Sequence, residues 1–181
     1  MSDRFLVYSG VMPPYSWDNV VCNNWDAITP ASSPSIIGTS MTACLVITLY
    51  DLKNRKGVMA HLGGYKKYII SPREMWPENV IDTMLGHFDS NASLESTVSG
   101  ENDVKEKSSR FPILLGKLHQ YGIPILGTDV GIIEELGRCA FLHCDSGLVE
   151  IYRTGKADEE LRRALGIELP SVDRRTEAII L

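Results

Sequence analysis

The chain has 181 residues, of which 44% are hydrophobic and 23% are charged, and its formal net charge is −5. This balance is typical of a folded domain with its own core, and a mildly acidic chain has no general electrostatic attraction for nucleic acid or anionic membranes. The length suits one domain over residues 1–181, and the acidic charge gives no reason to expect a nucleic-acid partner. No stretch reaches the roughly 18 apolar residues of a membrane helix, so we expect no membrane insertion.

The chain starts with an apolar run that is too short for a secretory signal peptide. We therefore expect a cytoplasmic location, and export without a cleaved signal stays open. The cysteines form no Cys-x-x-Cys pair, and a reducing cytoplasm would keep them as thiols. Cys139, His143 and Cys144 lie close together in sequence, but a strand would direct the two thiols to opposite faces. We expect a buried strand there, with no metal site and no cofactor.

The first forty residues predict short extended segments joined by irregular ones. Residues 1–18 contain glycine, two adjacent prolines and tyrosines, and they are expected to form an irregular N-terminal arm. Residues 19–28 are a candidate short strand, and the proline- and serine-rich stretch 29–35 is typical of a loop. Residues 36–40 are a further strand candidate.

A hairpin is predicted next. Residues 44–50, with the sequence CLVITLY, are mostly aliphatic and β-branched, which favours a strand. The polar segment 51–57 ends in glycine and is typical of a turn, and residues 58–62 form the return strand. Cys44 and His61 therefore lie at the open end of one predicted hairpin.

Helices are predicted in the middle of the chain. Apolar residues recur at helical spacing over 80–88. Residues 108–122 predict a second helix, with Ser108 or Ser109 as its N-cap. A short strand around 96–98 and a polar loop are expected between the two helices.

The last third of the chain returns to strands. Residues 123–131 predict an apolar strand, and residues 138–155 predict a hairpin that turns at 145–147. A short helix over 157–167 carries acids first and arginines later, which suits the helix dipole, and the tail after it is expected to be loose. The fold class that follows is α/β (α+β), with antiparallel hairpins and at least two covering helices.

The register of the first hairpin decides whether Cys44 and His61 can meet. A four-residue loop over 52–55 pairs Asp51 with Lys56, and counting back along both strands places Cys44 opposite Gly63. His61 is then the diagonal neighbour of Cys44 on the same face. A slip of one residue would turn the two side chains to opposite faces.

A cysteine beside a histidine can carry nucleophilic catalysis. A thiol near neutral pH is mostly protonated, and only the thiolate attacks a carbonyl carbon. An adjacent imidazole takes the proton, giving a thiolate–imidazolium pair, and then passes it to a leaving amine. A third polar group normally orients the ring. This chemistry suits deamidation, proteolysis or acyl transfer, and the residues alone also leave open a buried thiol with a structural histidine.

Several motifs resemble those of CheD, the chemoreceptor glutamine deamidase family. That family has a cysteine, an aliphatic run that ends in aspartate, a polar turn and a Gly-x-Met-x-His motif. The corresponding stretches are CLVITLYD at 44–51 and GVMAH at 57–61. Downstream segments resemble the strands of the family in the same order: GIPILGTDVG at 122–131, GRCAF at 137–141 and SGLVEIY at 146–152.

The resemblance covers residues 19–155, leaving 1–18 as an arm and 156–181 as a C-terminal helix and tail. It implies a β-sandwich core with helices outside, similar to the catalytic domains of cytotoxic necrotizing factors and related deamidase toxins. It also implies that Cys44 and His61 are the catalytic pair and that no cofactor is needed. The expected partner is a protein substrate that carries a reactive glutamine, and the oligomeric state stays open.

The chain departs from the family pattern before its cysteine. The third catalytic residue of the family is a threonine six positions before the cysteine, where this chain has Gly38. Thr39, Ser40 or Thr42 can supply the hydroxyl instead. We prefer Thr39 and expect a bulge to turn its side chain toward Cys44.

The leading expectation is therefore a cysteine-dependent amidohydrolase, a protein-glutamine deamidase with Cys44 and His61 at the bottom of an open groove. The alternatives are a non-catalytic chemotaxis-type adaptor on the same scaffold and a cysteine peptidase or transglutaminase. The tryptophans are expected to pack in the core or at its edges rather than to line a substrate groove. Asp129 is expected to cap a turn, with a bracing role at the site as the alternative.

Overall fold

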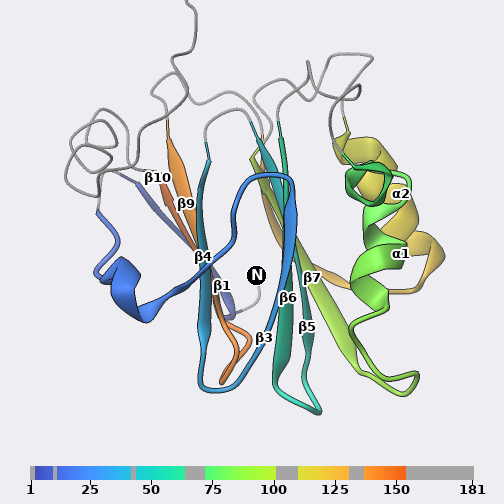
Figure 1. Cartoon of the computed structure of the whole chain (residues 1–181), viewed down its shortest axis with the longest axis horizontal. Coiled ribbons are helices and arrows are strands. Elements are labelled where there is room, and N and C mark those ends of the chain that lie inside the picture. Colours follow the sequence, from blue (N-terminus) through green and yellow to red (C-terminus); the bar gives the residue numbers. More distant parts are fainter. Residues whose placement is uncertain are drawn as a thin grey trace, which may run out of the picture.

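A computed structural model describes residues 3–9, 12–41, 44–63, 72–100, 110–130 and 137–153. These residues form two five-stranded mixed sheets that pack face to face, with two short helices on the outer side of one sheet (Figure 1). The protein is therefore mainly β, and the predicted α/β class is corrected accordingly, because the helices are short and cover one face only.

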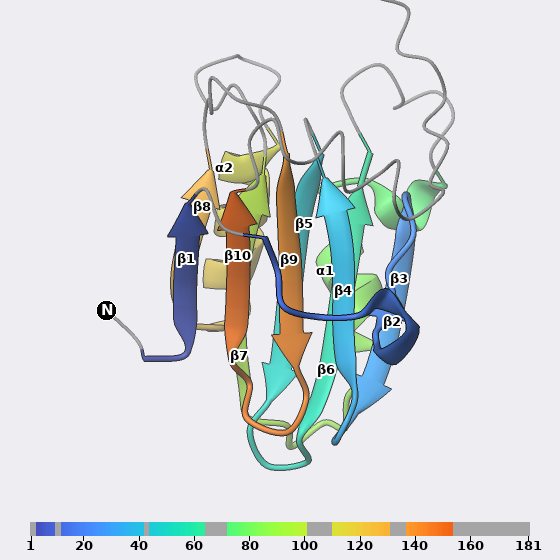
Figure 2. The same cartoon turned by 90° about the vertical axis from the view of Figure 1, so that its left-hand side faces the viewer.

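The first sheet lies nearest the viewer in Figure 2. In spatial order it contains β1 (Phe5–Ser9), β10 (Val149–Arg153), β9 (Arg138–His143), β4 (Ile36–Met41) and β2 (Val21–Cys22). The two outermost strands run parallel to their neighbours, and the inner pairs are antiparallel. The hairpin predicted near the end of the chain is confirmed as β9 and β10.

The second sheet carries the hairpin of interest at its centre. In spatial order it contains β3 (Ala27–Ser32), β6 (Lys56–Leu62), β5 (Leu45–Asp51), β7 (Leu94–Gly100) and β8 (Ile125–Val130). Helices α1 (Val80–Leu85) and α2 (Phe111–Gln120) cover its outer face (Figure 1). Among the described residues, neither helix is long and apolar enough to cross a membrane.

Every residue of β5 is buried because both of its faces are covered. Leu45, Ile47 and Leu49 pack toward the helices, in a cluster that we call the helix-side core. Val46 and Tyr50 alternate with them and pack toward the first sheet, in the inter-sheet core. Side chains at the two ends of the hairpin can therefore point into the space between the sheets.

Two predictions for the first third of the chain are wrong. The arm predicted over 1–18 contains β1, which extends the first sheet by pairing with β10. The loop predicted over 29–35 is largely β3, which pairs with β6 as far as Ser32. Pro30 is tolerated there because β3 is an edge strand, so the missing N–H leaves no partner strand unpaired.

The helices occur where they were predicted, but they are shorter. The first ends at Leu85, and the second begins after Arg110, which occupies the N-cap position. The predicted caps Ser108 and Ser109 and the terminal helix over 157–167 lie outside the described residues. The single domain over 1–181 stays a prediction.

The outer face of the first sheet carries a buried polar contact. Glu150 is 6% exposed, and its carboxylate accepts hydrogen bonds from Tyr15, from Tyr152 at 3.2 Å and from Nε2 of His143 at 2.8 Å. Burial alone would raise the pKa of Glu150, but these hydrogen bonds more than offset it, and the pKa lies below its ordinary value. The contact anchors the segment before β2, through Tyr15, to the first sheet.

This contact predicts a loss of stability in acid. A carboxyl group whose pKa is lowered by folding stabilises the fold above the pKa of the unfolded chain, and that contribution disappears as the pH falls through the folded value. Glu150→Gln should lower the free energy of unfolding at pH 7 by about 1 to 3 kcal/mol and flatten its acid dependence. Urea unfolding between pH 3 and 7 measures both effects. Glu78→Gln on the exposed surface is the matched control, and equal pH profiles for the two variants would contradict the prediction.

Candidate active site

The register predicted for the first hairpin is confirmed. Val46 pairs with His61, Leu45 pairs with Leu62, and the turn between β5 and β6 spans the four residues 52–55. Continuing the pairing by one residue places Cys44 opposite Gly63, with His61 diagonal to it. Cys44 is half-buried and packs against the inter-sheet core, so its side chain lies on the same face of the hairpin as His61.

The position of Cys44 depends on a glycine in β7. Gly100 pairs with Leu45 and has a φ of +106°, in the region that favours glycine. A Cβ atom on Gly100 would lie 2.0 Å from the backbone oxygen of Cys44. The close approach of these two backbones therefore requires the absence of a side chain at position 100.

His61 receives its orienting hydroxyl from the opposite sheet. Thr39 lies in β4, and its Oγ1 is 2.8 Å from Nδ1 of His61. Along β4, Ile37 and Met41 pack in the inter-sheet core, so Thr39 faces inward and Ser40 faces outward. Thr39, the hydroxyl that we preferred, therefore contacts the ring of His61. The expected bulge does not bring it there. The chain passes from one sheet to the other between Thr39 and Cys44, and Thr39 reaches His61 from the facing sheet.

A second hydrogen bond fixes the tautomer of the ring. Thr39 Oγ1 is also 2.8 Å from the backbone oxygen of Asn23, which can only accept. The single hydroxyl proton therefore goes to Asn23, and the hydroxyl accepts the proton of Nδ1. This leaves the lone pair of the neutral imidazole on Nε2, which is buried and has no hydrogen-bond partner among the described residues.

Burial keeps this imidazole neutral. His61 is 4% exposed, and desolvation is the main reason that its pKa falls to about 4. The carboxylate of Asp26 and the backbone hydrogen bond with Asn23 act in the opposite direction, while the charge of Arg110 lowers the pKa further. At neutral pH, His61 is an uncharged base. This favours a thiol beside a neutral imidazole in the resting protein over the preformed ion pair expected from the hairpin chemistry.

Gly63, the residue across from Cys44, forms hydrogen bonds through both its N–H and its carbonyl group. The N–H of Gly63 donates to Oδ1 of Asp26 at 2.8 Å, and its carbonyl accepts a hydrogen bond from Nη1 of the buried Arg110. These contacts fix the end of β6 beyond His61. Sequence reasoning missed Asn23, Asp26 and Arg110, because each contact joins a side chain to a backbone group far away along the chain, and no motif marks such contacts.

The remaining predicted residues fall into other roles. Asp129 does not cap a turn: it is 3% exposed and accepts from Nε of Arg138 at 3.1 Å and from Arg153. Cys139 and Cys144 point to opposite faces of the first sheet, as predicted. Within the described ranges, no group of three or more His, Cys, Asp or Glu side chains could hold a metal ion.

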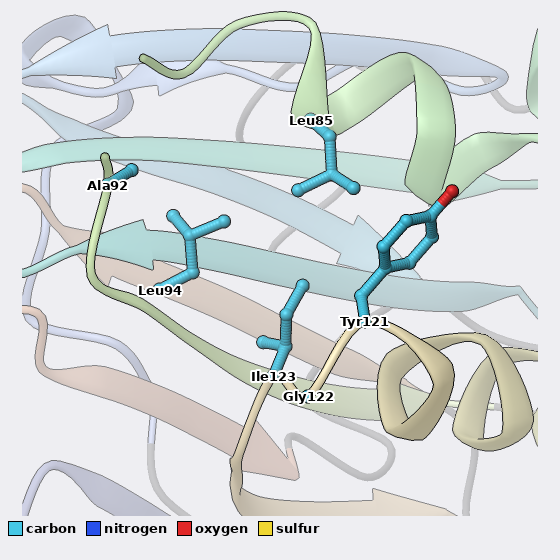
Figure 3. Close-up of a pocket in the computed structure, with 6 residues that line it drawn as sticks. All are labelled: Leu85, Ala92, Leu94, Tyr121, Gly122 and Ile123. Carbon is cyan, nitrogen blue, oxygen red and sulfur yellow. The ribbon is translucent and has the colours of Figure 1, made fainter. Parts of the chain in front are cut away.

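A pocket drawn in Figure 3 lies on the helix side of the second sheet, because Leu85, Leu94 and Ile123 among its lining residues pack in the helix-side core. It lies beside the ends of α1 and α2 and is lined by Leu85, Ala92, Leu94, Tyr121, Gly122 and Ile123. None of these side chains belongs to the Cys44 site, and none carries a nucleophile or a base except for the tyrosine hydroxyl, which donates to Asp82. The pocket therefore has no part in the chemistry considered below.

The Thr39 contact predicts a measurable tautomer. In the wild type, ring nitrogen-15 shifts should show Nδ1 protonated and Nε2 bare. Thr39→Val should abolish this preference and slow alkylation of Cys44 about ten-fold, because the ring is no longer held. Thr39→Ser should retain both properties. Ser40→Ala, on the outward face, is the matched control, and a response to Ser40→Ala equal to that of Thr39→Val would contradict the assignment.

The Gly100 contact predicts that a methyl group displaces the thiol. Gly100→Ala should lower the rate of Cys44 alkylation by about a hundred-fold, because the backbone of Cys44 must shift by ångströms. Gly122→Ala is the control: Gly122 also has a positive φ, of +65°, but a Cβ there meets no atom within 4 Å. In urea unfolding, Gly122→Ala should lose about 1 to 2 kcal/mol of stability, and Gly100→Ala should lose more because its Cβ also meets the backbone of Cys44. Equal alkylation rates in the two variants would refute the proposed proximity.

Comparisons with known proteins add no relative. The chain matches no family model and no curated protein. The likeness to the chemoreceptor deamidases therefore remains a matter of motifs and their order, and the geometry of Thr39, His61 and Cys44 is the main basis for a functional proposal.

Proposed function

We propose that the protein is a protein-glutamine deamidase in which Cys44 is the nucleophile and His61 is the base. One observation carries the proposal. A buried neutral imidazole has Nδ1 held by Thr39, and its Nε2, which has no hydrogen-bond partner in the described part of the chain, shares a hairpin face with a half-buried thiol. These are the residue types expected from the CheD resemblance, with the hydroxyl one position later than in the family pattern. The arrangement supports a CheD-like version of the β-sandwich.

The first half of the reaction forms a thioester. Nε2 of His61 accepts the thiol proton as Sγ of Cys44 attacks the carboxamide carbon of the glutamine side chain. The tetrahedral intermediate then breaks its C–N bond, and the imidazolium returns the proton to the leaving nitrogen, which departs as ammonia. Thr39 keeps Nδ1 protonated throughout, so Nε2 is the atom that exchanges protons.

The second half of the reaction uses water. Nε2 of His61 accepts a proton from a water molecule, which attacks the thioester carbonyl. The C–S bond breaks, the proton on Nε2 returns to the sulfur of Cys44, and the product is glutamate. The carboxylate of Asp26 raises the pKa of His61, so it favours the imidazolium that forms transiently in each half.

Burial of the base favours a side-chain amide over a peptide bond. His61 is almost fully enclosed between the sheets, and only a slender group can bring its carbonyl carbon to the thiol while leaving nitrogen close to Nε2. The glutamine side chain is unbranched and ends in its amide. A main-chain amide would have to carry two flanking residues into the same space, which makes peptidase activity the weaker alternative.

Substitution of the pair provides the test. Wild-type protein should release ammonia from benzyloxycarbonyl-glutaminyl-glycine or from casein, and Cys44→Ser and His61→Ala should each reduce the rate by at least about a thousand-fold while the domain stays folded. Far-ultraviolet circular dichroism and thermal unfolding verify the fold. A folded Cys44→Ser variant that still turns over would end the proposal.

The reactivity of the thiols separates an enzyme from an adaptor. At pH 7, iodoacetamide should label Cys44 faster than the exposed Cys22, and His61→Ala should remove that advantage. Burial raises the pKa of Cys144 to about 11, so that thiol stays inert and serves as an internal reference. Labelling of Cys44 no faster than Cys22 would favour the non-catalytic adaptor, and cleavage of casein into fragments would favour the peptidase.

A further inference from the structure

Among the described residues, Trp25 is an exposed aromatic residue that contacts the end of the hairpin. An ideal Cβ on Gly63 would lie 2.4 Å from Nε1 and 2.7 Å from Cε2 of the indole, so the ring covers the inward side of that glycine. Gly63 follows His61 by two residues and therefore presents the same face. The indole thus lies beside the position across from Cys44, one strand spacing of about 5 Å away.

The indole is placed firmly but is not enclosed. The next residue, Asp26, has a φ of +50° and binds the N–H of Gly63, and Arg110 binds the carbonyl of the same glycine. The turn that carries Trp25 is therefore attached to the end of β6. Trp25 itself remains 42% exposed, so a large part of its apolar surface faces solvent at the end of the sandwich where Cys44 lies.

We propose that Trp25 is a specificity-determining residue that packs against the two methylene groups of the substrate glutamine. This inference rests on the proposed deamidase function and deepens it. A glutamine that delivers its amide to Cys44 must lay its aliphatic stem along the neighbouring surface. An indole offers a rigid apolar wall for that stem at little entropic cost. Asparagine, with one methylene fewer, cannot reach the thiol and keep the same contact.

Gly63 contributes to the same proposed contact by leaving room for the indole. Its missing side chain is the space that the indole edge occupies, and any Cβ would push the ring away from the end of β6. A glycine here therefore serves the placement of the wall rather than the conformation of the strand. The edge position of Trp25 agrees with the sequence prediction, and its exposed surface leaves the indole accessible for the proposed contact.

The test compares two electrophiles that react with the same thiol. Iodoacetamide is small and does not need the indole surface to react. N-acetyl-6-diazo-5-oxo-norleucine amide has an aliphatic stem as long as that of glutamine and can pack against it. Trp25→Ala should reduce Cys44 labelling by the long reagent about ten-fold or more and leave labelling by iodoacetamide unchanged. Trp25→Phe should retain most of the preference, and Gly63→Ala should lose it. Trp17→Ala, which removes an indole from the outer face of the first sheet, is the matched control and should leave the preference intact.

Turnover gives a second readout. With glutamine peptides, Trp25→Ala should raise KM about ten-fold with kcat nearly unchanged, and it should narrow the preference for glutamine over asparagine peptides. An unchanged label preference in Trp25→Ala would overturn the role of Trp25, even if the wild type is an active deamidase. A loss of labelling by both reagents would show that Trp25 only supports the fold. If the wild type releases no ammonia, the deamidase proposal fails, and the labelling preference still decides whether Trp25 recognises the stem.

Discussion

The chemistry of this site depends on where one hydroxyl proton goes. Thr39 lies between the carbonyl of Asn23, which can only accept, and the ring of His61. The proton must go to Asn23, so the ring must donate from Nδ1 and keep its lone pair on Nε2. The same contact joins β4 of one sheet to β6 of the other. The base is therefore aligned only when the two sheets are packed together.

Enclosure of the base has two opposing consequences. It keeps His61 neutral across the physiological range, because burial lowers its pKa to about 4. It also makes the imidazolium that the proposed mechanism requires costly, since a buried charge needs compensation. The nearby carboxylate of Asp26 and the hydroxyl of Thr39 supply part of this compensation. The mechanism we propose therefore activates the thiol chiefly as it attacks, when the proton transfer is coupled to bond formation.

The sequence predicts the hairpin well because local rules determine it. The β-branched run, the polar turn and the loop length together set the register that pairs Val46 with His61, and that register is the one observed. Thr39 illustrates the limit of such rules. Counting along a single strand could bring it toward Cys44 only through a bulge, whereas in the structure it reaches His61 from the facing sheet. Contacts between sheets depend on how the strands are arranged in the whole fold. The pattern of apolar residues within 39–61 carries no information about that arrangement.

Apolar packing alone cannot hold two sheets in one relative position, because the hydrophobic effect is not directional. Directional contacts between the sheets occur at the hairpin and at the edge strand β8. At the hairpin, Thr39 of β4 contacts His61 of β6. At the edge strand, Asp129 of β8 is bound by Arg138 of β9 and by Arg153 of β10. A buried ion pair adds little net stability, but it has few alternative arrangements, so it favours one alignment of the sheets. The orientation of the His61 ring therefore depends on the alignment of the two sheets, whereas the spacing between Cys44 and His61 follows from the register of the hairpin itself.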